Sequence, residues 1–434
     1  MRKAAAGLLV LSCLGCGGDS ATGPSGTSDC STLAQVRFVR QTLRDVYLWY
    51  RELPDPDLAG FASPEAYLEA VRYKPLDASY SYVANKAESD AFFSESQFIG
   101  IGLSTRQTSE TELRISQVFP DSPAAEASLA RGDFLLQING KAVPDLLRTG
   151  EIDSIFGPSQ VGVKVTLAWR NREGAHFDAT LVKRVVTIPT VSATRVYDRR
   201  GSRVGYVFFR NFVRPSTAAL DAAFADLGGA DVTDLVLDLR YNGGGLLSVA
   251  QHLASLIGGA ATHDQVFVEL SHNDKNTSRN STLRFTDPSG ALGLPRLIVI
   301  ATRASASASE AVINGLRPFM PVTVVGATTF GKPVGQYGYD FCDKTLFPVA
   351  FQVLNARRQG DYFTGIPADC AAPDDLDHDI GDEGEASLAE ALQYLRTGSC
   401  SAQATSAAAA HARREMRIGT GLPRDPWRQL VGAY

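Results

Sequence analysis

The sequence predicts a multidomain α/β protein, and three observations support that prediction. The chain has 434 residues, which at about 100 to 200 residues per domain gives two to four domains. Its patterning changes from helical periodicity, through short alternating strands, to strands that alternate with helices. Hydrophobic residues make up 44% of the chain and charged residues 21%, which excludes collagen, coiled coil and wholesale disorder.

The composition of the chain argues against two classes of ligand, nucleic acids and metal ions. The 42 basic and 47 acidic residues give a net charge of −5, without the basic excess that nucleic-acid binding requires. The six histidines include no pair at metal-ligand spacing. We therefore expect no nucleic-acid partner and no dedicated metal site.

The N-terminal segment has the pattern of a secretory signal. Arg2 and Lys3 precede a short apolar run over residues 4–11, and small residues follow it. That run is shorter than the about 20 apolar residues that a membrane-spanning helix needs. The segment is therefore predicted to be a targeting sequence and not part of the fold.

Two cysteines directly follow this apolar run. The context of Cys13 and Cys16 resembles a bacterial lipobox, in which the cysteine is lipidated and becomes the new N-terminus. We favour Cys16, so that residues 1–16 form a lipoprotein signal peptide and residues 17–29 a flexible tether. This interpretation predicts a lipid-anchored protein on the periplasmic side of the cell envelope, in the outer membrane; an ordinary cleaved signal peptide is the alternative.

Residues 30–92 are predicted to form a small helical domain. Apolar residues recur there at a spacing of three to four: Val36, Phe38, Val39, Leu43, Val46 and Leu48. Pro54 and Pro56 interrupt this pattern. Ser63 and Pro64 restart it, because serine is a preferred N-cap and proline suits the first helical position.

Residues 97–189 are predicted to form a β-domain with Gly-rich turns, and this segment resembles a PDZ domain. The resemblance rests on Gly100-Ile101-Gly102-Leu103, Ser122-Pro123-Ala124, Gly132-Asp133, Ile138-Asn139-Gly140 and the strand at 157–167. It implies that the amides of the Gly100 to Leu103 loop bind the terminal carboxylate of a peptide, whose last residues add a strand to the sheet edge. A spacer or lid is the alternative role.

Residues 192–395 are predicted to form an α/β sheet. Buried strands are expected at 204–210, 235–239, 297–301 and 322–325, and helices at 216–227, 246–257 and 309–317. Sites in such folds gather beyond the carboxyl ends of the strands. The three segments that follow these strands are therefore candidates for catalytic residues.

The first segment is residues 238–245, DLRYNGGG, whose glycines let the backbone approach an anion closely. Its spacing matches no nucleotide-binding fingerprint, and a tight turn is the structural alternative.

The second segment is residues 304–310, ASASASE, which offers an accessible serine at the start of a helix, although Ser309 also suits an N-cap. The third is residues 328–336, in which a lysine whose pKa is lowered by burial is a candidate general base and an exposed lysine the alternative.

Together, these three segments resemble the C-terminal processing (tail-specific) serine proteases, over residues 30–395. The resemblance implies a ClpP/crotonase-type core, with Ser307 as nucleophile and Lys332 as base, 25 positions later. Some members orient the lysine with a glutamine four residues on, here Gln336. The acid that others place eleven residues after the serine is absent, because Pro318 stands there.

The same resemblance implies an oxyanion hole made by the amides of Ala308 and of Gly243 or Gly244. The expected activity is an extracytoplasmic serine endopeptidase, acting through an acyl-enzyme on proteins or peptides whose free C-termini the PDZ domain binds. It needs no metal or cofactor, and the N-terminal lipid would attach it to a membrane.

Two alternatives remain open. A Ser-His-Asp triad would need a histidine such as His252 or His378. A catalytically silent PDZ-containing peptide-binding envelope lipoprotein is the non-enzymatic alternative. Ser307→Ala separates this last class from a protease, because binding would survive the change and proteolysis would not.

The remaining cysteines number four, Cys30, Cys342, Cys370 and Cys400, which suggests disulfides in an oxidising compartment and allows three pairings. We predict Cys342 with Cys370, and Cys30 with Cys400.

Two further regions carry weaker expectations. The polar insert at 263–293 is expected to be a long loop at the surface, or one that shapes the substrate entrance. The tail at 401–434 shows no fold, and its partly apolar end, residues 430–434, is a candidate to occupy the PDZ groove or to be trimmed.

Overall fold

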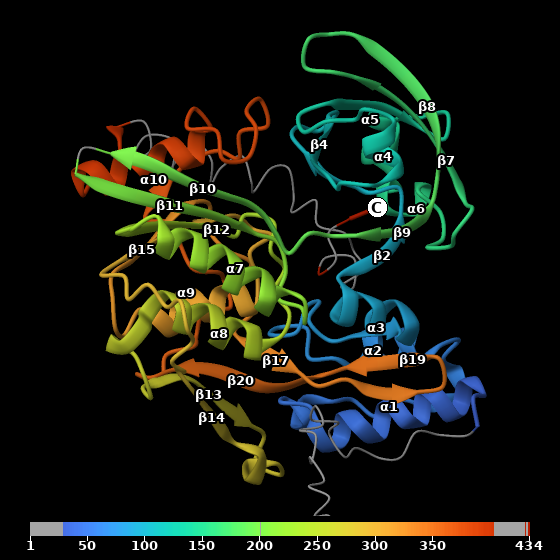
Figure 1. Cartoon of the computed structure of the whole chain (residues 1–434). Coiled ribbons are helices and arrows are strands. Elements are labelled where there is room, and N and C mark those ends of the chain that lie inside the picture. The colour runs from blue at the N-terminus through green and yellow to red at the C-terminus, as the bar shows by residue number, and fades with distance from the viewer. Residues whose placement is uncertain (1–28, 200, 403–429, 431–432) are drawn as a thin grey trace, which may run out of the picture.

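The computed structural model describes residues 29–199, 201–402, 430 and 433–434, and Figure 1 shows their arrangement. They form an N-terminal domain, a PDZ-like domain over residues 97–189, and an α/β core that follows it. The predicted signal peptide, with Cys13 and Cys16, lies outside the described residues, as does most of the tail. Within the described ranges, no helix is both long and apolar enough to cross a bilayer.

The N-terminal domain starts with the helices that the sequence predicts. Ser31 caps α1 (Thr32–Val46), and Ser63 caps α2 (Pro64–Val71) through the amide of the third helical residue in each case. Two short 3-10 turns, η1 (Tyr50–Glu52) and η2 (Leu58–Gly60), lie between them. The region that carries the two prolines thus separates the helices as expected.

A small sheet, which was not predicted, completes this domain. β1 (Tyr82–Asn85) pairs antiparallel with β19 (Lys344–Phe347), which pairs with β18 (Tyr339–Phe341), and α3 (Lys86–Glu95) follows β1. The β18–β19 hairpin comes from a segment far along the chain and packs on α1 through the stacked rings of Phe38 and Phe341. The two ring centroids are 4.8 Å apart.

The structure pairs the four cysteines differently from our prediction, which was wrong in both bonds. Cys30 bonds to Cys342, with a Cα–Cα distance of 5.9 Å, and Cys370 bonds to Cys400 at 5.4 Å. The reason is the hairpin: Cys342 lies at its turn, beside the start of α1. Cys370 lies instead in the core sheet, against which the helix before Cys400 packs.

The PDZ-like domain is built on a strongly bent sheet in the order β3-β4-β5-β7-β8, with β6 paired to β5. Its strands are β2 (Gln97–Gly100), β3 (Leu103–Gln107), β4 (Leu113–Val118), β5 (Phe134–Ile138), β6 (Lys141–Ala142), β7 (Lys164–Arg170), β8 (His176–Val182) and β9 (Arg184–Thr187). Its helices are α4 (Pro123–Glu126), α5 (Val143–Thr149) and α6 (Ile152–Ile155). β2 and β9 pair with each other where the chain enters and leaves the domain.

The α/β core contains a six-stranded sheet in the order β10-β11-β12-β15-β16-β21, parallel from β11 onward. Its strands are β10 (Val191–Arg199), β11 (Ser202–Phe209), β12 (Asp234–Asp238), β15 (Leu297–Ala301), β16 (Val322–Gly326) and β21 (Cys370–Ala371). Its helices are α7 (Ser216–Gly229), α8 (Leu247–Gly258), α9 (Ala308–Leu316) and α10 (Ala386–Thr397), with η3 (Gly259–Ala261) after α8. This confirms the predicted α/β class.

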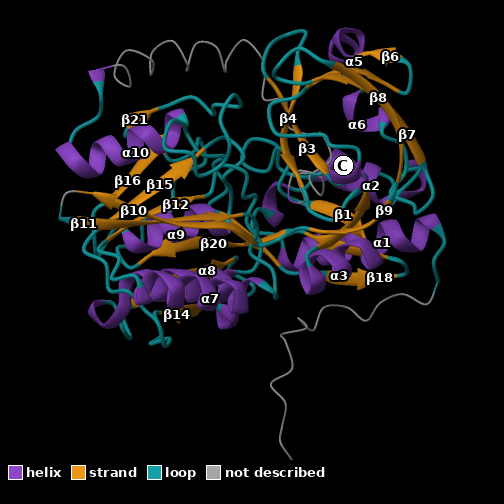
Figure 2. Cartoon of the chain, turned by 45° about the horizontal axis from the view of Figure 1, so that its top comes forward, coloured by secondary structure: helices purple, strands orange, loops and turns teal. Residues whose placement is uncertain are grey.

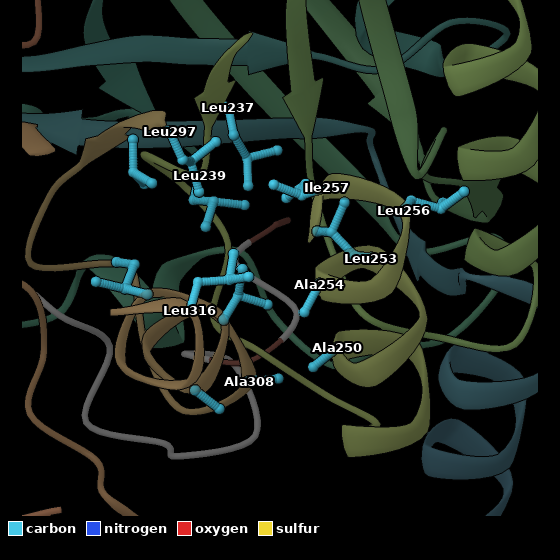
Figure 3. Close-up of a cluster of buried hydrophobic side chains, with 14 of the residues drawn as sticks. Leu237, Leu239, Ala250, Leu253, Ala254, Leu256, Ile257, Leu297, Ala308 and Leu316 are labelled. Atoms are coloured by element: carbon cyan, nitrogen blue, oxygen red, sulfur yellow. The ribbon is translucent and has the colours of Figure 1, made fainter. Parts of the chain in front are cut away.

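The residues of β12 pack alternately on the two faces of the sheet. Leu235 and Leu237 join the cluster formed with α7, α8 and α9. Figure 3 shows part of this cluster, including Leu237 and, at its lower edge, Ala308 at the start of α9. Val236 points to the other face, where it meets Leu388 of α10. Figure 2 shows this layered arrangement, with helices on both sides of the sheet. Helix α9, which begins next to Ser307, is therefore fixed by the main core.

A second sheet, in the order β14-β13-β20-β17, covers the far side of α8 and α9. Its strands are β13 (Val266–His272), β14 (Ser281–Arg284), β17 (Val334–Gln336) and β20 (Val349–Asn355), with η4 (Thr277–Arg279) between the first two. The insert at 263–293 is thus not the long loop that we expected. It supplies a hairpin, because Phe267 and Val268 are buried against the core while its polar residues form the connecting turn.

Candidate active site

The three segments singled out in the sequence meet at one edge of the core sheet. β12, β15 and β16 are parallel neighbours, so their carboxyl ends lie side by side. The glycine segment follows β12, the serine segment follows β15, and the lysine segment follows β16. The topology therefore places Ser307, Lys332 and the glycines on adjacent loops.

Ser307 occupies a strained turn between β15 and α9. Its φ of +54° lies in the left-handed region, which non-glycine residues rarely adopt. It is the N-cap of α9, so the alternative in which Ser309 is the cap is wrong. Ser309 is fully buried, and its hydroxyl donates to the Asn242 carbonyl oxygen at 2.9 Å. A serine on a sharp strand-to-helix turn has the placement of a nucleophile.

Asn242 joins the glycine segment to the serine segment. Its carbonyl oxygen also accepts the Ala306 amide at 3.1 Å, and its side-chain nitrogen donates to the Phe209 carbonyl oxygen at 3.0 Å. Gly244 has a φ of +101°, and a Cβ there would lie 3.0 Å from the Ala308 nitrogen. A glycine is therefore required for this close approach of the two loops.

The amides expected to form an oxyanion hole differ in their hydrogen bonds. The Gly244 amide donates to Asn242 Oδ1 at 2.9 Å, so it is already engaged. Within the described part of the chain, the amides of Gly243 and Ala308 have no acceptor. Of the two glycines left open by the sequence, this pattern favours Gly243 as the partner of Ala308.

A buried carboxylate, which the sequence analysis did not single out, connects the serine and lysine loops. Glu310 is fully buried, and its Oε2 accepts the amides of Ser307 (2.9 Å) and Lys332 (2.8 Å). The two amide nitrogens therefore lie within about 6 Å of each other. Oε1 accepts the Gly331 amide at 2.7 Å and the Thr329 hydroxyl at 2.5 Å.

Burial raises the pKa of Glu310, while these four donors oppose that effect. The sequence held a usable signal for this residue. Glutamate at the third position of a helix that starts after Ser307 is the pattern of a capping box.

Lys332 is held by the glutamine that the resemblance names. Its ammonium donates to Gln336 Oε1 at 2.6 Å. The Gln336 amide nitrogen donates to the carbonyl oxygens of Tyr80 (2.6 Å) and Phe347 (2.7 Å), which fixes the orientation of the side chain. Burial lowers the pKa of Lys332 to about 8, although the charges of Asp77 and Glu310 act in the opposite direction. A neutral amine is therefore accessible near neutral pH.

The N-terminal domain contributes directly to the lysine end of the site. The Tyr80 hydroxyl donates to the Gly331 carbonyl oxygen, and its ring centroid lies 5.9 Å from the Lys332 ammonium. The segment that carries Tyr80 is in turn fixed by Asp77, a fully buried carboxylate that accepts the amides of Tyr80 (2.8 Å) and Ser81 (2.9 Å). The sequence contains no local pattern that identifies these residues.

The histidines of the competing triad chemistry have partners elsewhere. His252 pairs with Asp221 at 2.7 Å, between α8 and α7, and His378 pairs with Asp375 at 2.6 Å. Among the described residues, no hydrogen bond links a histidine to Ser307. This arrangement disfavours a Ser-His-Asp triad.

The PDZ-like domain contacts the core next to the glycine segment. Arg131 donates to the Tyr241 hydroxyl at 2.7 Å and to Asp374 at 3.1 Å. Arg240, on the core side, also contacts Asp374 and is fully buried with it. Tyr241 directly precedes Asn242, so this charge network connects the PDZ-like domain with the loop that meets the serine.

The predicted peptide-binding loop is occupied by the last residue of the sequence. The amides of Ile101, Gly102 and Leu103 donate to the main-chain oxygen of Tyr434. Gly100 contributes space for the bound residue, because a Cβ there would lie 2.4 Å from the Tyr434 carbonyl carbon. Residues 431–432 of the predicted groove-binding segment lie outside the described residues.

Potential metal ligands gather at one place in the described ranges, formed by Cys370, Glu390 and Cys400. Both sulfur atoms belong to the disulfide there, so this group is not a metal site.

Comparison with protein families assigns the three parts. Residues 34–82 match the peptidase S41 N-terminal domain, residues 114–171 a PDZ domain, and residues 203–371 peptidase family S41. The PDZ-like domain is accordingly called the PDZ domain below.

Individual proteins give the same result. The chain is 27% identical to a CtpA-like serine protease of Staphylococcus saprophyticus, over 72% of this chain and 60% of that protein. It is 29% identical to a carboxy-terminal-processing protease of Bartonella bacilliformis, over 61% and 60%. An S41 protease structure from Bacteroides fragilis matches with a TM-score of 0.67 and 26% identity, over 83% of this chain and 97% of that one. The matched region thus spans about 60% of the length of the two curated relatives.

Proposed function

Because the chain belongs to peptidase family S41, a family of serine-type peptidases, we propose that it is an endopeptidase with Ser307 as nucleophile and Lys332 as general base. The observation that carries this proposal is the shared carboxylate of Glu310. It binds the main-chain amides of both residues, beside a lysine whose pKa burial lowers to about 8.

The reaction follows from the chemistry of these groups. Neutral Lys332 takes the proton of the Ser307 hydroxyl, and the oxygen attacks the carbonyl carbon of a peptide bond. The amides of Ala308 and Gly243 donate to the oxyanion of the tetrahedral intermediate, each contributing roughly 10²- to 10³-fold in rate.

Collapse of this intermediate breaks the C–N bond. The Lys332 ammonium, held by Gln336, returns the proton to the leaving amine. Water then attacks the acyl-enzyme with Lys332 again accepting a proton, and the serine is regenerated. No step in this scheme calls on a cofactor.

The proposed substrates are proteins or peptides that the PDZ domain binds by their C-termini. The amides of Ile101, Gly102 and Leu103 support this, because they converge on one main-chain oxygen of a docked residue. The contact between Arg131 and Tyr241 provides a physical connection from this domain to the glycine loop.

The proposed location is the periplasmic side of the cell envelope, with a lipid on Cys16 as the membrane anchor. Its support is the sequence of residues 1–16 and the two disulfides, which are typical of proteins outside the cytosol. Mass spectrometry of the mature N-terminus tests it: an unmodified Cys16 and Cys13 would contradict the anchor.

The test of the activity uses the chain from residue 29 onward, which contains every described element. We would incubate it with an unfolded reporter protein that has an apolar C-terminus and follow the fragments by mass spectrometry. Ser307→Ala is expected to reduce cleavage about 10⁶-fold, as removal of a nucleophile does in serine proteases. Ser289→Ala, on an exposed loop, is the matched control and should leave the rate unchanged.

Cleavage that survives Ser307→Ala would contradict the proposed nucleophile. Binding of the reporter without cleavage by any form would instead support the catalytically silent lipoprotein.

A further inference from the structure

The PDZ domain holds a ligand within this chain, namely its last residue. The main-chain oxygen of Tyr434 accepts hydrogen bonds from the amides of Ile101 (3.1 Å), Gly102 (2.8 Å) and Leu103 (3.3 Å). The Tyr434 amide donates to the Leu103 carbonyl oxygen at 2.8 Å. In Figure 1 the chain end, marked C, lies between the strands of the PDZ domain and α6. This is the geometry of a peptide end that extends a sheet edge beside an anion-binding turn.

These main-chain contacts are independent of the sequence of the bound peptide, so selectivity must come from the side chains. The Tyr434 ring stacks on Phe156, with the ring centroids 4.1 Å apart and the planes 19° from parallel. Only 8% of Tyr434 is exposed, and it packs within the apolar cluster of the PDZ domain. The pocket is therefore filled by a flat aromatic ring.

At the far end of this pocket lies a carboxylate. The Tyr434 hydroxyl donates to Asp153 Oδ1 at 2.6 Å, and Asp153 lies on α6, three residues before Phe156. Phenylalanine would retain the stacking but would not donate to Asp153, although its ring would still displace water from that carboxylate. A hydrogen bond to a charged group strengthens binding enough to distinguish the two residues by roughly 10- to 100-fold in affinity.

The position before the tyrosine is also enclosed. Ala433 is 6% exposed and lies in a cluster with Phe92 of the N-terminal domain, Phe119 of the PDZ domain and Val213 of the core. Because the cluster in which this side chain is buried contains residues of three domains, a small residue fits there and a large one would require the cluster to rearrange.

We propose that the PDZ domain selects protein C-termini that end in tyrosine, that Asp153 determines this selectivity by accepting the phenol hydroxyl, and that Tyr434 is a tethered competitor for the same pocket. The consequence of this selectivity for cleavage rests on the proposed protease function. Peptide binding itself requires no proteolysis.

Competition follows from the tether. A ligand on the same chain has an effective concentration in the millimolar range, so an incoming peptide must displace it. The chain with Tyr434→Gly should therefore bind such a peptide at least about tenfold more tightly than the wild type.

The experiment measures binding of three fluorescent pentapeptides to the chain with Tyr434→Gly and Ser307→Ala. Their sequences are LVGAY, LVGAF and LVGAY with an amidated end. We expect LVGAY to bind roughly 10- to 100-fold more tightly than LVGAF, and the amidated peptide to bind weakly. Asp153→Ala should abolish the preference for tyrosine, and Asp153→Asn, which keeps an acceptor oxygen, should restore part of it. Asp145→Ala, on the exposed side of the neighbouring helix α5, is the matched control.

Equal affinities for LVGAY and LVGAF would overturn the proposal, as would a preference that survives Asp153→Ala, or the absence of binding by all three peptides. A melting curve of each variant identifies any that has not folded, and Asp153→Asn then provides the test. If LVGAY binds selectively while active Ser307 cleaves no reporter, the selectivity stands and the proposed protease function fails.

Discussion

The serine end and the lysine end of the candidate active site are stabilised by different parts of the molecule. Ser307 is fixed within the α/β core, where Asn242 and Glu310 are both fully buried and hydrogen-bond its segment. Lys332 depends on a second domain, because Gln336 donates to the carbonyl oxygens of Tyr80 and Phe347, and the Tyr80 hydroxyl donates to the Gly331 carbonyl oxygen.

This difference separates two properties of the proposed catalytic pair. The position of Ser307, the proposed nucleophile, is set within the core, whereas the basicity of Lys332 depends on how the N-terminal domain docks. Changes in the N-terminal domain should therefore alter the pH dependence of the reaction more than the geometry of the serine.

The largest effect is expected from Glu310→Gln, because this change affects both ends. A glutamine has only one acceptor oxygen for the four donors, and its NH₂ would face a donor. Displacement of either reacting group by about 1 Å costs roughly 100-fold in kcat, and a donor left unsatisfied costs about 1–3 kcal/mol of stability. Steady-state kinetics and thermal unfolding measure the two effects.

Glu390→Gln is the matched control, since Glu390 is also a buried acceptor but lies on α10, where it accepts the Ser401 amide. A Glu310→Gln enzyme with unchanged kcat would show that the shared carboxylate does not set the geometry of the site.

A smaller effect, confined to the lysine end, is expected from Gln336. Activity of the wild type should rise with pH through about 8, because Lys332 must be neutral to act as base and its ammonium form predominates below its pKa. Gln336→Glu places a negative charge beside the ammonium, which stabilises the charged form and should raise the half-maximal pH by about 1 pH unit or more. Gln336→Leu should lower kcat about tenfold, by leaving the amine unoriented.

The pH–rate profiles of kcat for the three forms provide this measurement, with Gln265→Leu on the exposed surface as control. A profile that stays flat from pH 6 to 9 in the wild type would argue against Lys332 as the base.

The smallest effect on activity is expected from removal of a disulfide. The effect should differ between the two bonds, because Cys30–Cys342 ties down the N-terminal domain, which supports the lysine end, whereas Cys370–Cys400 lies in the core. Replacing Cys30 and Cys342 with serine loosens the N-terminal domain from its hairpin, so kcat should fall several-fold with the change in basicity described above. Replacing Cys370 and Cys400 should lower the melting temperature and leave kcat near the wild-type value. The loops differ in length, 312 against 30 residues, so loss of the first bond should cost about 2 kcal/mol more. Equal kcat values for the two double variants would remove the proposed link between the N-terminal domain and the lysine.

Much of the fold was predictable, because local patterns determine it. The apolar run of β12 and the glycine and serine segments after the strands are visible within short windows of sequence. The resemblance also placed Ser307 and Lys332 on loops that the structure brings together, through Glu310.

What could not be predicted depends on contacts between distant segments. The pairing of Cys30 with Cys342 follows from a hairpin that joins the N-terminal domain to residues near 340, and no local sequence pattern predicts that contact. Tyr80 and Asp77 act at the lysine through the same docking. The insert at 263–293 appeared to be a loop because its polar turn outweighed the short alternation of β13.

The pairing of β1 with β19 also constrains when the enzyme can become active during its synthesis. The N-terminal helices leave the ribosome long before residues 344–347, so the sheet that completes their domain cannot close until most of the core has been made. The Gln336 anchor needs the carbonyl oxygens of both Tyr80 and Phe347, so the nascent chain has no oriented lysine until that late moment. A growing polypeptide therefore carries Ser307 before Lys332, the proposed base, can be oriented by Gln336.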